Sequence, residues 1–101
     1  MDCKVEWSPE ALKDIEFIAR YISRDSVFYA SAVVEKLLRI GRELAQFPLS
    51  GRIVPEINDK SIRERIVYGY RLIYRLQDET ITVAAVIHGK RLLDPIRERI
   101  Q

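Results

Sequence analysis

The stretch from Ala30 to Ala45 constrains the fold most strongly, because its apolar and small residues recur with the period of an α-helix. They occupy the i, i+3, i+4 and i+7 positions almost without a break: Ala30, Val33, Val34, Leu37, Leu38, Gly41, Leu44 and Ala45. A stripe of this kind must face a core, so the stretch predicts an amphipathic helix. Asp25 and Ser26, just upstream, are both suitable N-caps for it.

A first helix is predicted at about residues 9–23. Ser8 and Pro9 suit the N-cap and the first helical position. The apolar residues that follow lie at helical spacing: Leu12, Ile15, Ile18, Ala19 and Ile22. So short a connection to the next helix predicts an αα-hairpin. Residues 3–7, before the first helix, alternate and predict a short strand.

From Ile62 onward the apolar period changes to two, which indicates strands. We expect strands at about 62–67, 70–77 and 80–88, separated by Tyr68-Gly69 and Asp78-Glu79. Three consecutive strands joined by short turns predict an antiparallel meander. Leu72, Tyr74 and Leu76 share one side of the middle strand and are expected to be buried. Asp94-Pro95 is suited to begin a short final helix.

The order β-α-α-β-β-β predicts an α+β fold, with an antiparallel sheet and the helical hairpin packed on one face. We expect the opposite face to remain an open concave surface. A length of 101 residues suits a single domain, residues 1–101, with one core.

Composition excludes several classes of protein. A hydrophobic fraction of 48% and a charged fraction of 32% are typical of soluble globular proteins. No apolar run is long enough to span a membrane, and the N-terminus has no apolar signal segment. Cys3 is the only cysteine, which excludes an internal disulfide. We expect a cytoplasmic protein that does not contact membranes.

Basic residues are concentrated in the first two strands of the meander. Between residues 60 and 75, Glu64 is the only acid among five cations: Lys60, Arg63, Arg65, Arg71 and Arg75. A three-residue turn would bring all four arginines to one sheet face, where like charges favour an anionic ligand. A two-residue turn would place Arg63 and Arg65 beside Leu72 and Tyr74 and divide the set. Gly69 suits either turn.

His88, the only histidine, ends the last predicted strand. It suits either a general acid or base near neutral pH or a rim histidine that binds the following turn. Lys90 and Arg91 add cations at the same edge. The sequence has no second histidine and no ordered carboxylate pair, so we expect no metal site.

Four segments together resemble the RelE/ParE toxin superfamily, and most closely its ParE-like branch of plasmid-stabilisation proteins. They are FPLSGRIVPE (47–56), IRE (62–64), YRLIY (70–74) and VIHGKR (86–91). The resemblance covers nearly the whole chain. It implies the toxin of a type II toxin–antitoxin system, which arrests growth, needs no cofactor and is neutralised in a hetero-oligomer with a cognate antitoxin.

The superfamily contains two mechanisms. ParE-like members inhibit DNA gyrase, with no known hydrolytic chemistry, whereas RelE-like members cut mRNA on the ribosome. If the chain is RelE-like, the resemblance implies that Arg71, His88 and Arg91 are catalytic. Arg63 and Arg65 then approximate the two basic residues that RelE-like members carry on their central strands. The tyrosine that RelE-like members often carry near the C-terminus is absent, which favours the gyrase reading.

The resemblance also implies binding surfaces. Six cations are expected to contact the antitoxin or nucleic acid: Arg63, Arg65, Arg71, Arg75, Lys90 and Arg91. Arg97 and Arg99, in the C-terminal segment, are expected to contact gyrase, or else to lie on a solvated helix end. A third possibility is an inactive member that only binds its antitoxin.

Overall fold

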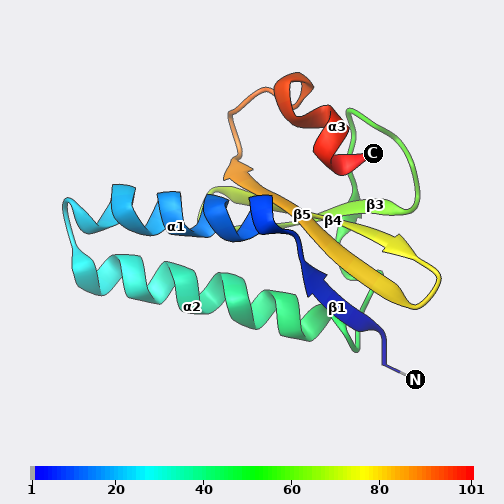
Figure 1. The fold of residues 1–101 in the computed structure, drawn as a ribbon, viewed down its shortest axis with the longest axis horizontal. Helices are drawn as coiled ribbons and strands as arrows, with labels where there is room; N and C mark the ends of the chain where they lie inside the picture. The colour runs from blue at the N-terminus through cyan, green and yellow to red at the C-terminus, as the bar shows by residue number, and fades with distance from the viewer. Residues whose placement is uncertain (1) are drawn as a thin grey trace.

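The computed structural model describes residues 2–101 and confirms the expected order of elements (Figure 1). The elements are β1 (Lys4–Trp7), α1 (Pro9–Ser23), α2 (Val27–Leu44), β2 (Arg52–Ile53), β3 (Ile62–Val67), β4 (Tyr70–Gln77), β5 (Thr80–His88), the 3-10 helix η1 (Asp94–Ile96) and α3 (Arg97–Ile100). The two-residue strand β2 was not predicted, because so short a segment carries no periodic signal.

Serine side chains begin both long helices, as the sequence predicts. Ser8 Oγ accepts a hydrogen bond from the Ala11 N–H at 3.0 Å, and Pro9 occupies the first turn. Of the two candidate caps for α2, Ser26 is the one used, and it accepts from the Tyr29 N–H at 3.0 Å. Capping satisfies amide groups that the first helical turn leaves unpaired. The short connection between the helices makes them an antiparallel hairpin (Figure 1).

The five strands form one sheet in the order β1-β5-β4-β3-β2. The meander of β3, β4 and β5 is antiparallel, as expected. β1 lies parallel to β5, with Lys4 opposite Thr80 and Trp7 opposite Val83, so the complete sheet is mixed. In the sequence, the helical hairpin lies between β1 and the meander. The first strand of the meander, β3, runs in the same direction as β1.

The β3–β4 turn has two residues, which selects one of the two registers left open by the sequence. Val67 pairs with Tyr70, and the turn residues Tyr68 and Gly69 have φ values of 50° and 81°. Two successive residues in the left-handed region are typical of a type I′ hairpin turn. Arg63 therefore lies opposite Tyr74 and Arg65 opposite Leu72.

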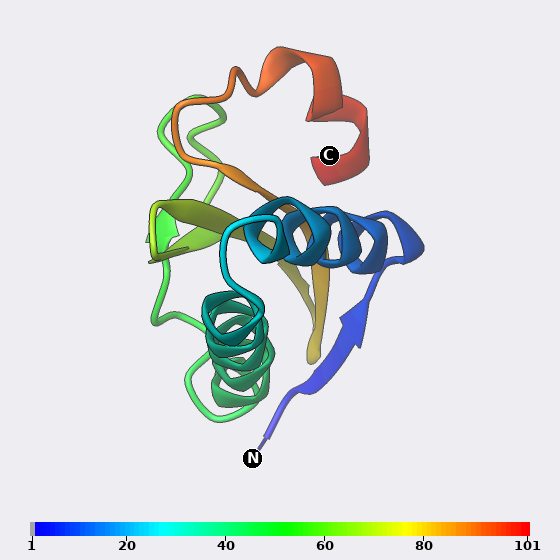
Figure 2. The same ribbon diagram turned by 90° about the vertical axis from the view of Figure 1, so that its left-hand side faces the viewer.

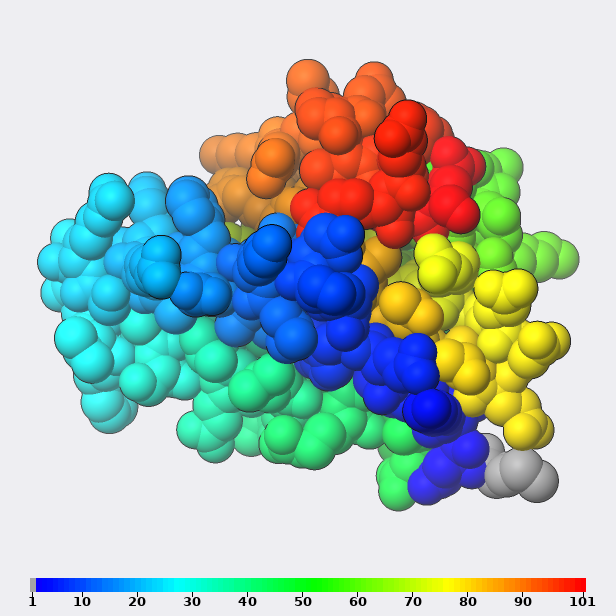
Figure 3. Space-filling view, in the orientation of Figure 1, coloured from blue at the N-terminus to red at the C-terminus, as the bar shows by residue number. Residues whose placement is uncertain are grey.

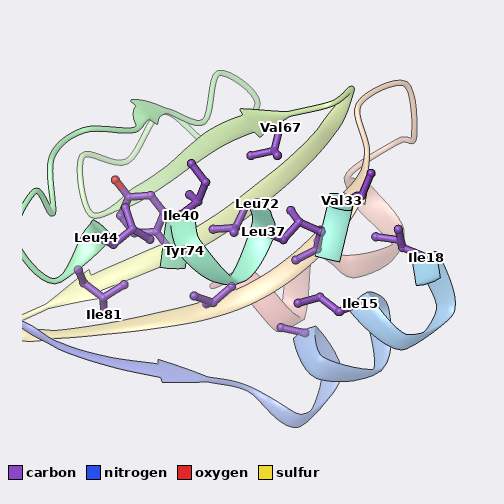
Figure 4. Close-up of a cluster of buried hydrophobic side chains, with 13 residues drawn as sticks. Ile15, Ile18, Val33, Leu37, Ile40, Leu44, Val67, Leu72, Tyr74 and Ile81 are labelled. Carbon is purple, nitrogen blue, oxygen red and sulfur yellow. The ribbon is translucent and has the colours of Figure 1, made fainter. Parts of the chain in front are cut away.

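The first hydrophobic core lies between the helical hairpin and the sheet. Figure 4 shows side chains from α1, α2 and the strands pointing into this layer. Leu37, Leu72 and Tyr74 have no exposed surface, and Leu76 packs at the edge of the cluster. The three β4 residues expected to face the core therefore do so.

The opposite face of the sheet is covered by a second apolar cluster, so the prediction of an open concave surface is wrong. Leu93, Ile96 and Ile100 of the C-terminal segment pack there against Ile73 and Ile87. Figure 2 shows this segment, orange to red, on the side of the sheet away from α2. The cause is the apolar spacing of the last ten residues, which gives the sheet a second buried layer.

Candidate functional site

Arg71 is almost completely buried in an ion-pair network. Its Nε donates to Glu64 Oε1 at 2.6 Å, and its Nη1 and Nη2 donate to the two carboxylate oxygens of Glu56 at 2.7 and 2.8 Å. Glu64, which is 1% exposed, also accepts from Arg52 Nε at 2.6 Å. Each nitrogen of the Arg71 guanidinium therefore already binds a carboxylate.

The network balances its own charge, because two arginines alternate with two glutamates. The hydrogen bonds from Arg71 lower the pKa of Glu56 to about 2. Conversely, the hydrogen bonds to Glu56 raise the pKa of Arg71 above its ordinary value. Both groups therefore stay charged near neutral pH. We name this set (Arg52, Glu56, Glu64 and Arg71) the buried ion-pair network.

Arg63 and Arg65 lie on the other face of the sheet, so the four arginines do not converge. Arg63 Nη1 donates to the Gly51 carbonyl at 3.0 Å. Arg65 Nη1 donates to Ser50 Oγ at 3.2 Å, and its Nη2 lies 3.6 Å from Glu43 Oε2. Both arginines thus fasten the turn after α2 onto β3.

Arg75 and Arg99 hold the C-terminal segment in place. Arg75 Nη1 donates to the Ile100 carbonyl at 3.2 Å. Arg99 Nη2 donates to Asp14 Oδ2 at 2.6 Å and to the Ala84 carbonyl at 3.1 Å. Figure 3 shows this segment, orange to red, lying against the blue N-terminal half of α1. Asp14 was not predicted from the sequence, where it is an ordinary helix-surface acid.

The remaining predicted cations are more accessible. His88, Lys90 and Arg91 are exposed, and none of them forms an ion pair within residues 2–101. His88 Nδ1 accepts from the Lys90 N–H at 3.2 Å, as the rim-histidine alternative expects. Arg97 pairs with Asp94 at 3.0 Å, and its side chain is 37% exposed.

A groove of about 710 Å³ lies between α1 and the end of β5. Its lining is mostly apolar and aromatic, with cations at the rim: Lys13, Asp14, Phe17, Ile18, Tyr21, Tyr70, Val86, Ile87, His88 and Arg91. A hollow of about 300 Å³ shares Tyr21, Tyr70 and His88 with this groove. Pockets of several hundred cubic ångströms with such linings are typical of binding sites.

The aromatic residues that line one side of the groove were not predicted from the sequence. Phe17 and Tyr21 lie one helical turn apart and are 71% and 59% exposed. They fall outside the apolar stripe that covers the core, and an exposed i, i+4 aromatic pair was the available signal.

The described residues present no evident catalytic constellation. Within residues 2–101, no carboxylate binds the His88 ring. Within residues 2–101 there is no group of three or more histidine, cysteine or acidic side chains placed to hold a metal ion. Over the same residues, no helix has the length and apolarity needed to cross a bilayer.

Comparisons with known proteins agree with this fold. A structure of the chromosomal ParDE toxin–antitoxin system from P. aeruginosa has a chain with a TM-score of 0.71 and 15% identity, covering 87% of this chain and 97% of that one. A free mutant of the E. coli toxin RelE has a TM-score of 0.67 and 17% identity, covering 99% and 95%. No curated protein matches the sequence significantly.

The family model for the ParE toxin of the type II toxin–antitoxin system parDE matches residues 5–93. That range includes the helical hairpin, the whole meander and the groove. The chain therefore belongs to the ParE toxin family of type II toxin–antitoxin systems.

Proposed function

We propose that this chain arrests growth by inhibiting DNA gyrase, and that a cognate antitoxin neutralises it by binding in the groove between α1 and β5. One observation carries the choice of target: Arg71, the arginine that an RNA-cleaving relative would need, is enclosed by carboxylates. Three of its five N–H groups already donate to carboxylates, and the residue is only 5% exposed, so little of the guanidinium is open to a phosphate.

Cleavage of RNA would require cations for the phosphate and a group that activates the ribose 2′-hydroxyl. To serve the first role, Arg71 would have to displace Glu56, whose bidentate contact is strong and charge-assisted. For the second role, His88 has no carboxylate partner among the described residues. The alternative of a RelE-like endonuclease, with Arg71, His88 and Arg91 catalytic, is therefore less well supported.

The groove suits an antitoxin segment of mixed apolar and acidic character. Phe17 and Tyr21 offer exposed aromatic surface, while Lys13, Lys90 and Arg91 supply uncompensated positive charge near it. Burial of the aromatic rings would provide most of the affinity, and the cations would favour an acidic partner over a basic one. A segment that folds on docking would give up part of this free energy in ordering.

The C-terminal segment is the proposed gyrase contact, and two arginines allow a matched test. Arg97 is half-buried and Arg20 is exposed, and each pairs with an acid three or four residues earlier in the sequence, but Arg20 lies on α1 and faces solvent. We expect Arg97→Ala to weaken inhibition of gyrase supercoiling while antitoxin binding is unchanged. Arg20→Ala should change neither property.

The deciding experiment is a supercoiling and cleavage assay with purified gyrase, with and without the antitoxin encoded beside this gene. We expect the chain to inhibit gyrase and the antitoxin to relieve the inhibition. Intact gyrase activity together with codon-spaced mRNA cuts on translating ribosomes would overturn the proposal in favour of the endonuclease. Antitoxin binding with no effect on either target would identify an inactive member.

A further inference from the structure

The outer edge of β5 is unpaired where it forms a wall of the groove. β1 accompanies β5 only as far as Val83, opposite Trp7, and the chain then turns into α1. The backbone of Ser8 continues the contact by one bond, donating to the Val83 carbonyl at 3.0 Å. Beyond Ala84, no strand within residues 2–101 covers this edge.

The pairing of β5 with β4 determines which backbone groups point outward. Gly89 N–H donates to the Gly69 carbonyl at 2.7 Å, which makes those two residues a hydrogen-bonded pair. Bonded and non-bonded pairs alternate along an antiparallel ladder, so Tyr70–His88 and Leu72–Val86 are non-bonded pairs. The N–H and C=O groups of Val86 and His88 therefore point away from β4 and toward the groove.

Two of these four groups already have partners. Val86 N–H donates to Asp14 Oδ2 at 2.9 Å, and the His88 carbonyl accepts from Arg91 N–H at 3.0 Å. The Val86 carbonyl and the His88 N–H have no hydrogen-bond partner among the described residues. One acceptor and one donor thus remain, on either side of Ile87.

This remaining pair selects the direction of a further strand. In a parallel ladder, a residue of the incoming strand lies opposite one residue of the existing strand. It donates to the carbonyl of the residue before that one and accepts from the N–H of the residue after it. Those are the Val86 carbonyl and the His88 N–H. An antiparallel strand would instead exchange both bonds with Val86 or with His88, and each of these residues has one of its two groups occupied.

We propose that the groove takes an extended, acidic segment of the antitoxin as an additional strand, parallel to β5 and bonded on both sides of Ile87. This rests on the proposed function, because it names the binding mode of the antitoxin at the same groove. The rim cations Lys13 and Arg91 favour acids in the segment, since the lining carboxylate, Asp14, is already bound by Arg99. Addition of a strand to an exposed edge is a general mode of peptide recognition.

Single-stranded nucleic acid is the competing occupant, since exposed aromatics and nearby cations also suit stacked bases. The backbone pair favours a peptide, because an extended peptide supplies a donor and an acceptor in the register of a parallel ladder. Stacking on Phe17 and Tyr21 would use the aromatic wall and leave this pair without a dedicated partner.

Amide hydrogen exchange of the ¹⁵N-labelled chain, free and bound to the antitoxin encoded beside its gene, tests the proposal directly. The His88 amide should exchange at least about tenfold more slowly in the complex, because it becomes hydrogen-bonded. The Ile66 amide is a matched control: it points outward from the opposite edge of the sheet, beyond the end of β2, and lacks a partner among the described residues. Its exchange should not change.

Two variants separate the backbone bond from the imidazole. His88→Ala removes only the side chain, whereas His88→Pro also removes the N–H, at an edge position where proline is tolerated. We expect His88→Pro to bind the antitoxin about two- to tenfold more weakly than His88→Ala, the range for one hydrogen bond. If His88→Pro does not fold, hydrogen exchange of the unmodified chain still decides.

Tight antitoxin binding with an unprotected His88 amide would overturn strand addition and leave the proposed function intact. Protection of His88 by a single-stranded oligonucleotide, but not by the antitoxin, would overturn the assigned occupant. A failure of gyrase inhibition would count against the proposed target alone, because exchange in the antitoxin complex does not depend on gyrase.

Discussion

Replacing Arg71 with methionine gives the sharpest test of the buried ion-pair network. Methionine keeps much of the apolar length of the side chain but removes the cation between Glu64 and Glu56. Glu64 is 1% exposed and would keep Arg52 as its one remaining cation. Glu56 would lose its main partner and turn toward water, because its side chain is already 40% exposed.

The expected loss follows from these two carboxylates. Removing one partner of a buried ion pair typically costs about 3–5 kcal/mol, because a charge remains buried without compensation. For Glu64, Arg52 offsets part of this cost. For Glu56, the cost is smaller because its carboxylate can be solvated. We therefore expect the free energy of unfolding to fall by about 2–3 kcal/mol, out of roughly 5–15 kcal/mol for a domain of this kind.

Urea denaturation followed by circular dichroism measures this change. Arg20→Met is the matched control: it removes an arginine from an exposed ion pair with Glu16 and should cost less than about 0.5 kcal/mol. The double variant Glu64→Gln/Arg71→Met should recover part of the loss, since no charge is then left buried. An Arg71→Met variant as stable as the unmodified chain would refute the reasoning.

Three further predictions concern other parts of the molecule. Arg71 holds the pKa of Glu56 near 2, below its ordinary value of 4.5. The ionised Glu56 therefore stabilises the fold fully above pH 4.5, and this stabilisation is lost as the pH falls toward 2. Urea titrations between pH 5 and 2 should show a flatter decline in stability for Glu56→Gln. Gly41→Ala would place a methyl group in steric overlap with the Trp7 ring, so we expect the free energy of unfolding to fall by about 1–3 kcal/mol and tryptophan fluorescence to change. Tyr68 has a φ of 50° and contacts Tyr29 edge to face. Tyr68→Asn should relieve about 1 kcal/mol of backbone strain, minus the free energy of the lost contact, and so raise the melting temperature; a lower melting temperature would contradict this.

The secondary structure was predictable because local periodicity determines it. The expected strands 62–67, 70–77 and 80–88 and the helix 9–23 match the structure at both ends. The parallel pairing of β1 with β5 joins residues more than seventy positions apart, and no local pattern specifies it. The cover over the second sheet face depends likewise on where the last ten residues dock.

The orientation and contacts of the arginines were harder to predict, because they depend on the strand register and on partners distant in the sequence. A local count between residues 60 and 75 treats Glu64 as a minor offset to five cations. In the structure Glu64 binds both Arg52 and Arg71, and Glu56, which lies outside that window, completes the network. A charge count along the sequence therefore overestimates the positive charge that β3 and β4 can offer to a ligand.

Positive charge available to a partner lies instead around the groove. Lys13 and Arg91 line the groove, and Lys90 precedes Arg91 in the turn after β5. None of the three forms an ion pair within residues 2–101. The arginines of β3 and β4 already bind carboxylates or backbone carbonyls, so an anion would have to displace those contacts. An acidic segment would meet no such competition at the groove, where two unpaired backbone groups also lie. Electrostatics and backbone geometry thus indicate the same surface, while the hydrogen bonds of Arg63, Arg65 and Arg75 connect the sheet to the turn after α2 and to the C-terminal segment.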